Sequence, residues 1–118
     1  MNILLCEDDK NFGLVLKREL EESQHTVDLV PNGVEGVLGF ITTPYDFVLL
    51  DIVMPRLNGI DALRIIKKIN PNVPVITFSG NAGSREMEES IMCGAKKCLR
   101  KPFCVAELKD DIRNHHLK

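Results

Sequence analysis

The sequence predicts an α/β fold in which a five-stranded parallel sheet is wrapped by helices on both faces. Apolar runs of about five residues alternate with longer stretches at helical spacing, and this alternation continues along all 118 residues. Two of the runs, Phe47–Leu50 and Val75–Phe78, are continuous and partly β-branched, as is typical of parallel strands covered on both faces. Five β–α units in succession therefore favour a doubly wound domain.

The strands are predicted at the short apolar runs, which are Ile3–Cys6, Thr26–Val30, Phe47–Asp51, Val75–Ser79 and Lys97–Arg100. The first helix follows the first run, because apolar residues recur there at helical spacing. Its predicted inward stripe consists of Phe12, Val15, Leu16 and Leu20. A second helix is predicted over Gly33–Thr43, although Gly36 and Gly39 each cost about 1 kcal/mol relative to Ala.

Three further helices complete the alternation. The third helix repeats the apolar stripe, with Ala62, Leu63, Ile66 and Ile69. The fourth, Ser84–Cys93, is the most polar, with only Met87, Ile91 and Met92 to bury. The last follows Pro102 and carries Val105, Leu108 and Ile112.

Composition and charge exclude several classes of protein. With 44% hydrophobic and 27% charged residues, a chain of 118 residues can bury a core without disulfides or a structural metal. A formal net charge of -2 argues against direct binding of nucleic acid by this domain. No apolar run reaches the ~18–20 residues of a membrane span, and Met1–Glu7 lacks the basic region of a signal peptide. We expect one cytoplasmic domain spanning residues 1–118.

The four cysteines fit a reducing compartment. Cys6 lies in an apolar run, where a free cysteine behaves as a small buried hydrophobe. A zinc site is the less favoured alternative, because the short ligand spacings of structural zinc sites are missing. Such a site would draw on Cys93, Cys98, Cys104, His115 and His116.

Charged and hydroxyl residues gather where the predicted strands end. The first strand is followed by Glu7-Asp8-Asp9, the third ends in Asp51, the fourth in Ser79, and the fifth is followed by Lys101. Open parallel sheets bind ligands beyond the carboxyl ends of their strands. Helix capping is the alternative for the acidic run, and for Asp9 in particular, but it explains neither Asp51 nor Lys101.

These residue types together suit phosphoryl chemistry. Clustered carboxylates repel one another unless a cation joins them, and carboxylates with water and phosphate oxygens are ligands that magnesium prefers. A carboxylate beside such a metal can attack phosphorus and form an aspartyl phosphate. Ser79 and Lys101 are the hydroxyl and the ammonium that would bind the phosphoryl oxygens.

In these motifs the whole chain resembles the receiver domains of two-component response regulators. The resemblance rests on an acidic run after the first strand, then D-x-x-M-P-x-x-x-G, S-G and G-A…K-P-F. These correspond to Glu7-Asp8-Asp9, Asp51–Gly59, Ser79-Gly80 and Gly94–Phe103. It implies a flavodoxin-like (βα)5 fold with strand order 2-1-3-4-5, and a single receiver domain, alone or as the N-terminal part of a longer regulator.

The resemblance also implies roles for residues in the acidic pocket. Asp51 would be the phosphoacceptor. Asp8, Asp51 and the backbone carbonyl of Val53 would bind Mg²⁺, with Glu7 acting through water. Ser79 would be the switch hydroxyl that closes on the phosphoryl group.

Further positions carry roles by the same resemblance. Lys101 would pair with the phosphoryl group, and the Lys101–Pro102 peptide bond would be cis. Side chains at Val53 and Asn81 would influence how water reaches the phosphoryl group. An apolar Val53 cannot orient an attacking water, so we predict that dephosphorylation is not fast.

As a receiver, the domain would take its phosphoryl group from a sensor histidine kinase, a phosphotransfer protein or a small phosphodonor. It would promote only its own phosphorylation and dephosphorylation. Phosphorylation would remodel the face formed by Ser84–Cys93, Lys97–Arg100 and the last helix, which would control an effector that the sequence does not identify. A homodimer through this face is one alternative.

Two departures from the family pattern concern this face. Cys98 stands where the family has its switch aromatic, so the usual coupling to Ser79 is in question, and a redox role for this thiol is a minor alternative. Lys96, Lys97 and Arg100 form a basic cluster, which is either a solvated edge or a docking site for an acidic partner.

Three other functions are the alternatives to a receiver. A receiver-like interaction module that is not phosphorylated remains an alternative. A haloacid-dehalogenase-type phosphatase would carry a second acid two residues after its nucleophile, where this chain has Val53. A flavodoxin would need a Ser/Thr/Gly-rich phosphate loop after the first strand, and Glu7-Asp8-Asp9 occupies that place.

Overall fold

A computed structural model describes residues 1–54, 56–80 and 83–114 of the chain. The strands are β1 (Asn2–Cys6), β2 (Thr26–Val30), β3 (Phe47–Asp51), β4 (Val75–Ser79) and β5 (Lys97–Arg100). The helices are α1 (Lys10–Glu22), α2 (Gly33–Thr42), α3 (Gly59–Ile69), α4 (Ser84–Met92) and α5 (Val105–Asn114). All predicted strands are confirmed; β1 begins one residue earlier than predicted, and α2 and α4 each end one residue earlier.

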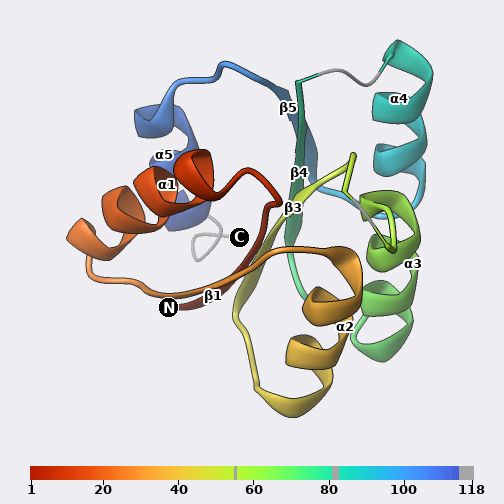
Figure 1. Ribbon diagram of the computed structural model, residues 1–118, viewed down its shortest axis with the longest axis horizontal. Coiled ribbons are helices and arrows are strands. Elements are labelled where there is room, and N and C mark those ends of the chain that lie inside the picture. Colours follow the sequence, from red (N-terminus) through yellow and green to blue (C-terminus); the bar gives the residue numbers. More distant parts are fainter. Residues whose placement is uncertain (55, 81–82, 115–118) are drawn as a thin grey trace.

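The five strands form one parallel sheet in the order β2-β1-β3-β4-β5, which confirms the predicted fold and topology. Helices α1 and α5 cover one face of the sheet, and α2, α3 and α4 cover the other (Figure 1). Every residue of β3 and β4 is buried. Because all five strands are parallel, their carboxyl ends lie at one edge of the sheet, and the charged and hydroxyl residues that end or follow the strands lie at that edge.

Alternate residues of the strands point to opposite faces of the sheet and pack into two hydrophobic layers, one on each face. In β1, Ile3 and Leu5 pack toward α1 and α5, whereas Leu4 and Cys6 pack toward α2 and α3. Helix α2 lies so close to β1 that a Cβ atom on Gly36 would come within 2.6 Å of Cys6 Sγ. Burial raises the pKa of the Cys6 thiol to about 12, so this cysteine is the inert core residue that was predicted.

Four residues predicted to be inward are exposed instead. Val15 of α1 is 60% exposed and Ile69 of α3 is 47% exposed. In α4, Ile91 and Met92 are 46% and 86% exposed, and the helix buries Ser90 in their place. Periodicity identified all three helices correctly. In α3 the other three predicted residues are buried and Ile69 is the last residue of the helix, whereas α4 turns a different face, that of Ser90, toward the sheet.

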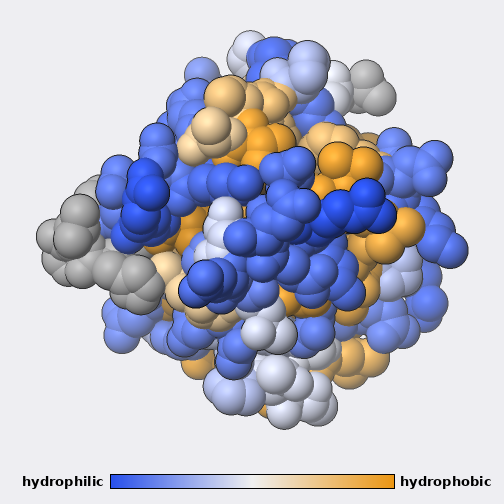
Figure 2. Space-filling view, turned by 90° about the vertical axis from the view of Figure 1, so that its left-hand side faces the viewer, coloured by the Kyte–Doolittle hydropathy of each residue, from blue (hydrophilic) through white to orange (hydrophobic). Residues whose placement is uncertain are grey.

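Within residues 1–54, 56–80 and 83–114, none of the helices has the length and hydropathy of a membrane span. The side of the molecule formed by α1 and α5 is mostly hydrophilic, with apolar patches between the charged side chains (Figure 2).

Candidate functional site

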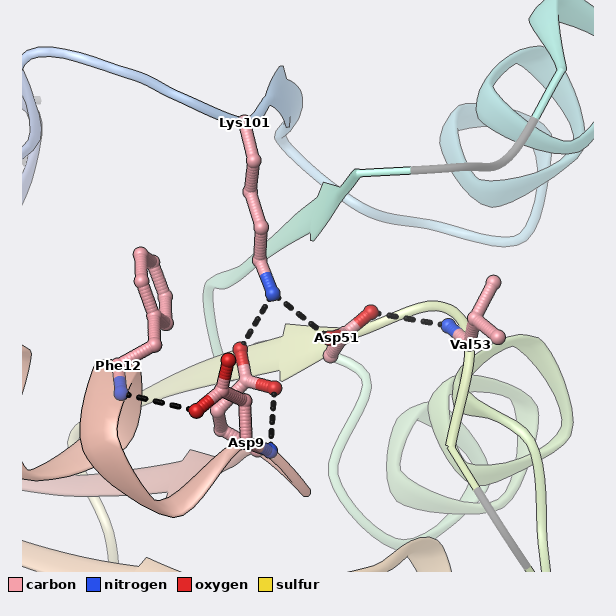
Figure 3. A network of polar contacts seen from close by, with 6 residues as sticks. Asp9, Phe12, Asp51, Val53 and Lys101 are labelled. Carbon is pink, nitrogen blue, oxygen red and sulfur yellow. Dashed lines mark hydrogen bonds and ion pairs between the residues drawn. The ribbon is translucent and has the colours of Figure 1, made fainter.

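Asp51 ends β3 with its side chain fixed by contacts to both carboxylate oxygens. Oδ1 accepts a hydrogen bond from the Val53 backbone N–H at 2.9 Å, and Oδ2 accepts one from Lys101 Nζ at 2.9 Å (Figure 3). The residue is only 4% exposed. Because β3 is hydrogen-bonded on both sides by β1 and β4, the position of this carboxylate is set by the centre of the sheet.

The glycine of the D-x-x-M-P-x-x-x-G motif lets the chain return against β3. The Gly59 N–H donates to the Ile52 carbonyl at 2.7 Å, at the first residue of α3. A Cβ atom at Gly59 would come within 2.0 Å of the Asp51 carbonyl oxygen, a backbone atom that cannot move aside. Only glycine allows this approach, so the spacing within the motif is a packing requirement beside Asp51.

Glu7 and Lys101 form the second part of the site. Glu7 is 2% exposed, and its Oε1 accepts a hydrogen bond from Lys101 Nζ at 2.6 Å. Its other oxygen accepts the Asp9 backbone N–H at 3.1 Å. Asp9 itself caps α1 by accepting the Phe12 N–H at 3.2 Å, which confirms the capping interpretation for that residue (Figure 3).

The charges of these groups depend on one another. Burial raises the pKa of Glu7 to about 7, although the hydrogen bond from Lys101 opposes this shift. Burial alone would lower the pKa of Lys101, but its hydrogen bonds to Glu7 and Asp51, and their negative charges, raise it overall. Lys101 therefore stays cationic and compensates two buried acids.

Glu7, Asp8 and Asp51 can hold a metal ion. One oxygen from each of the three carboxylates lies within 4.8 Å of the others, and no other group of three or more His, Cys, Asp or Glu in the described residues does so. Asp8 is exposed, whereas the other two are buried. Hard oxygen donors of this kind suit magnesium, so the donor set fits the predicted metal.

The zinc alternative gains no support from the described residues. Cys6 is buried, Cys93 and Cys98 are half-buried, and Cys104 is exposed, all as free cysteines. None of them belongs to the metal-binding group within residues 1–54, 56–80 and 83–114. His115 and His116 lie outside the described residues.

Ser79 and Val53 flank the carboxylates. Ser79 ends β4, is 1% exposed, and its carbonyl accepts the Lys101 N–H at 2.8 Å. The side chain of Val53 is half-exposed to solvent beside Asp51. Asn81 lies outside the described residues, and the Lys101–Pro102 peptide bond is cis, as the resemblance implied.

One contact of the site was not predicted. Lys101 Nζ lies 4.4 Å from the ring centroid of Phe12, which the sequence marked only as a core residue. Phe12 also packs edge-on against Phe103, with ring centroids 5.8 Å apart. The position of Phe12 in the first turn of the helix after the acidic run is the sequence signal that could have identified this contact. The aromatic rings thus confine the lysine side chain above the acids.

Cys98 and the basic cluster, the two departures from the family pattern, both have partners within the domain. Cys98 is half-buried and packs against Ile52 and Ile60, in a small apolar cluster next to α3 and α4. Lys97 forms ion pairs with Glu107 and Asp111 of α5 at 3.0 and 3.1 Å. One member of the basic cluster is therefore paired within the domain, which favours the solvated-edge interpretation for it.

Comparison with protein families gives a match to the response regulator receiver domain over residues 3–113. The transcriptional regulatory protein CusR of Escherichia coli is 34% identical over 113 residues, 96% of this chain and 50% of CusR. RprY of Bacteroides fragilis, also named a transcriptional regulatory protein, is 31% identical over 92% of this chain and 46% of its own length. The chain therefore spans about half the length of these curated relatives.

Solved structures agree with the fold. The receiver domain of Francisella response regulator 1452 has a TM-score of 0.87 and 31% identity, covering 99% of this chain and 98% of that one. A two-component response regulator from Clostridium difficile has a TM-score of 0.94 over 100% of this chain and 97% of that one. At 21% identity, the second likeness supports the fold alone.

Proposed function

The chain belongs to the response regulator receiver domain family, and we propose that Asp51 is the residue on which it accepts a phosphoryl group. Its function is that of a receiver domain in two-component signal transduction. The observation that carries the assignment of Asp51 is the bond from Lys101 Nζ to Asp51 Oδ2, 2.9 Å long, within the cluster of three carboxylates.

The residues present suit the transfer step. An Asp51 oxygen would form the bond to phosphorus while the bond to the donor breaks, leaving the donor's imidazole when the donor is a phosphohistidine. Lys101, already held over the acids, would pair with the transferred oxygens, and Ser79 would donate its hydroxyl to them. Mg²⁺ held by Asp8, Asp51 and the Val53 carbonyl, with Glu7 acting through water, would supply charge neutralisation.

The partners and setting are proposed from the same likeness. A sensor histidine kinase or a phosphotransfer protein would be the donor, and the face of α4, β5 and α5 would respond and control an effector or a homodimer. The domain would promote only its own phosphorylation and dephosphorylation, in the cytoplasm. Because the relatives are about twice as long, residues 1–118 would form one receiver module, alone or joined to an effector domain.

The test is the intact mass of the protein after incubation with acetyl phosphate and magnesium. We expect a gain of about 80 Da, the mass of one phosphoryl group, that requires magnesium and is lost in Asp51→Asn. Asp9→Asn is the matched control, because asparagine also caps helices and the adduct should persist. Absence of an adduct in the wild type would favour the interaction module that is not phosphorylated.

A further inference from the structure

Helix α4 is attached to the sheet in a different way from its neighbour α3. Helix α3 buries five residues, four of them apolar side chains and the fifth Gly59, whereas α4 buries Ser90 alone. Ile91 and Met92, which the sequence predicts to be buried, are exposed. Since apolar burial is the main non-directional force that holds a helix to a sheet, α4 depends to an unusual degree on its polar contacts.

Two of those polar contacts are on the surface. Glu89 of α4 forms an ion pair with Arg64 of α3 at 3.1 Å, and both side chains are about half-exposed. The Sδ of Met87 lies 3.2 Å from Arg100 NH2, and that contact is exposed too. Exposed pairs of this kind contribute little to stability, so they do not by themselves fix the helix.

A third contact is fully buried. Thr77 Oγ1 of β4 lies 2.7 Å from Ser90 Oγ, and both residues are 0% exposed. Thr77 Oγ1 also lies 3.4 Å from the Lys97 carbonyl of β5. Breaking the bond to Ser90 would therefore leave Thr77 with only that longer contact and would take from the buried Ser90 hydroxyl its partner on β4, which is costly. The bond therefore fixes the placement of α4 against β4 more firmly than its exposed contacts do.

The same strand carries the proposed phosphoryl-binding hydroxyl. Thr77 stands two residues before Ser79, so both side chains point to the same face of the sheet, and the contact of Thr77 with Ser90 identifies it as the face that α4 covers. Ser79 is also linked to the site through its carbonyl, which accepts the Lys101 N–H at 2.8 Å. A movement of Ser79 toward a phosphoryl group on Asp51 would shift the end of β4, two residues beyond the Thr77–Ser90 bond.

We infer that the buried hydroxyl pair Thr77–Ser90 couples the phosphorylation site to α4 in this domain. The inference rests on the proposed function of Asp51 and Ser79. Ser79 ends β4 and Thr77 lies two residues before it, so phosphorylation and the Thr77–Ser90 bond act on one short strand, and each changes the equilibrium of the other. Cys98 lies opposite Thr77 on the neighbouring strand β5. Its half-buried thiol is not required for the coupling from Ser79 through Thr77 and Ser90 to α4.

The experiment compares hydrogen exchange in α4 with and without acetyl phosphate and magnesium, in the full chain, while intact mass reports the adduct. In the wild type, phosphorylation should change the exchange rate of the α4 amides at least about threefold. In Thr77→Val/Ser90→Ala the adduct should still form, but that change should fall to less than about half its wild-type size.

The double variant is chosen because it replaces both partners by apolar groups of similar shape, which leaves no buried hydroxyl unpaired and preserves folding. Thr77→Ser keeps a hydroxyl and should retain the coupling. Exchange in α2, on the far side of α3, serves as the internal reference in each sample.

The outcomes separate the two proposals. A double variant that is phosphorylated and keeps the full α4 response overturns the inference, and so does a phosphorylated wild type without any α4 response. In both cases the adduct still supports Asp51 as the phosphoacceptor. A protein that forms no adduct rejects the proposed function, and the inference is rejected with it.

Discussion

The Lys101 ammonium lies 2.6 Å from Glu7 Oε1, although 94 positions separate the two residues in the sequence. Glu7 follows β1 and Lys101 follows β5, and strands β3 and β4 lie between those two in the sheet. The lysine side chain therefore reaches back over the carboxyl ends of two strands, and it contacts Asp51 on the way. This arrangement places one cation against two buried acids before any ligand is bound.

Removing that cation should destabilise the domain. In Lys101→Met, two buried carboxylates lose their partner, and the free energy of unfolding at pH 8 should fall by roughly 2–4 kcal/mol. The loss should be smaller at pH 6, because Glu7 can then take up a proton. Urea denaturation measures both values. Lys97→Met is the matched control: its ion pairs are more exposed, and it should lose less than about 1 kcal/mol. Equal losses in the two variants would contradict this account.

Magnesium affinity should depend on the protonation of Glu7. Burial raises the pKa of this carboxyl from 4.5 to about 7, so in the folded, metal-free protein it binds a proton as the pH falls through 7. Metal binding near the carboxylates must displace that proton, so the apparent magnesium dissociation constant should rise by about tenfold between pH 8 and pH 6. Calorimetric titration at several pH values measures it.

Glu7→Gln provides the comparison for the magnesium titration, because its amide has no proton to lose in this range. Its magnesium affinity should be weaker at pH 8 and nearly independent of pH from 8 to 6. A Glu7→Gln protein with the same pH dependence as the wild type would assign the effect to another group.

Two of the three glycines of α2, Gly36 and Gly39, should respond in opposite ways to alanine. A Cβ at Gly39 has its nearest neighbour at 3.8 Å, so Gly39→Ala should stabilise the domain by up to about 1 kcal/mol through helix propensity. At Gly36 the new atom would lie 2.6 Å from Cys6 Sγ, and overpacking should cost roughly 1–3 kcal/mol. Thermal unfolding compares them. Adding Cys6→Ala should recover part of the Gly36→Ala loss, and no recovery would rule out the sulfur atom as the cause.

The lifetime of the phosphorylated domain should depend on Val53. Its side chain is half-exposed two residues after Asp51 and has no polar group to orient an attacking water. We therefore predict as a hypothesis that Val53→Asn shortens the acyl-phosphate half-life, by about tenfold if the amide positions the water. Val53→Ala should leave the half-life close to that of the wild type. Equal half-lives for Val53→Asn and the wild type would reject the hypothesis.

The sequence was sufficient for the fold and for the carboxylates and the lysine that meet at one edge of the sheet. Strand and helix periodicity are local properties, so the five strands were predicted to within one residue and the strand ends could be read in order. Because parallel strands share one carboxyl edge, Glu7, Asp8, Asp51 and Lys101 were expected together, and the structure brings them together.

Only the tertiary structure decided how those residues meet. Periodicity predicts a helix but not its rotation against the sheet, so it did not reveal that α4 buries Ser90 instead of Ile91 and Met92. It also did not reveal that Lys101 would lie over Phe12, or that Gly59 would touch the Asp51 carbonyl. These contacts depend on the distances between elements far apart in the chain, which are set when the helices pack against the sheet and their side chains compete for the same space.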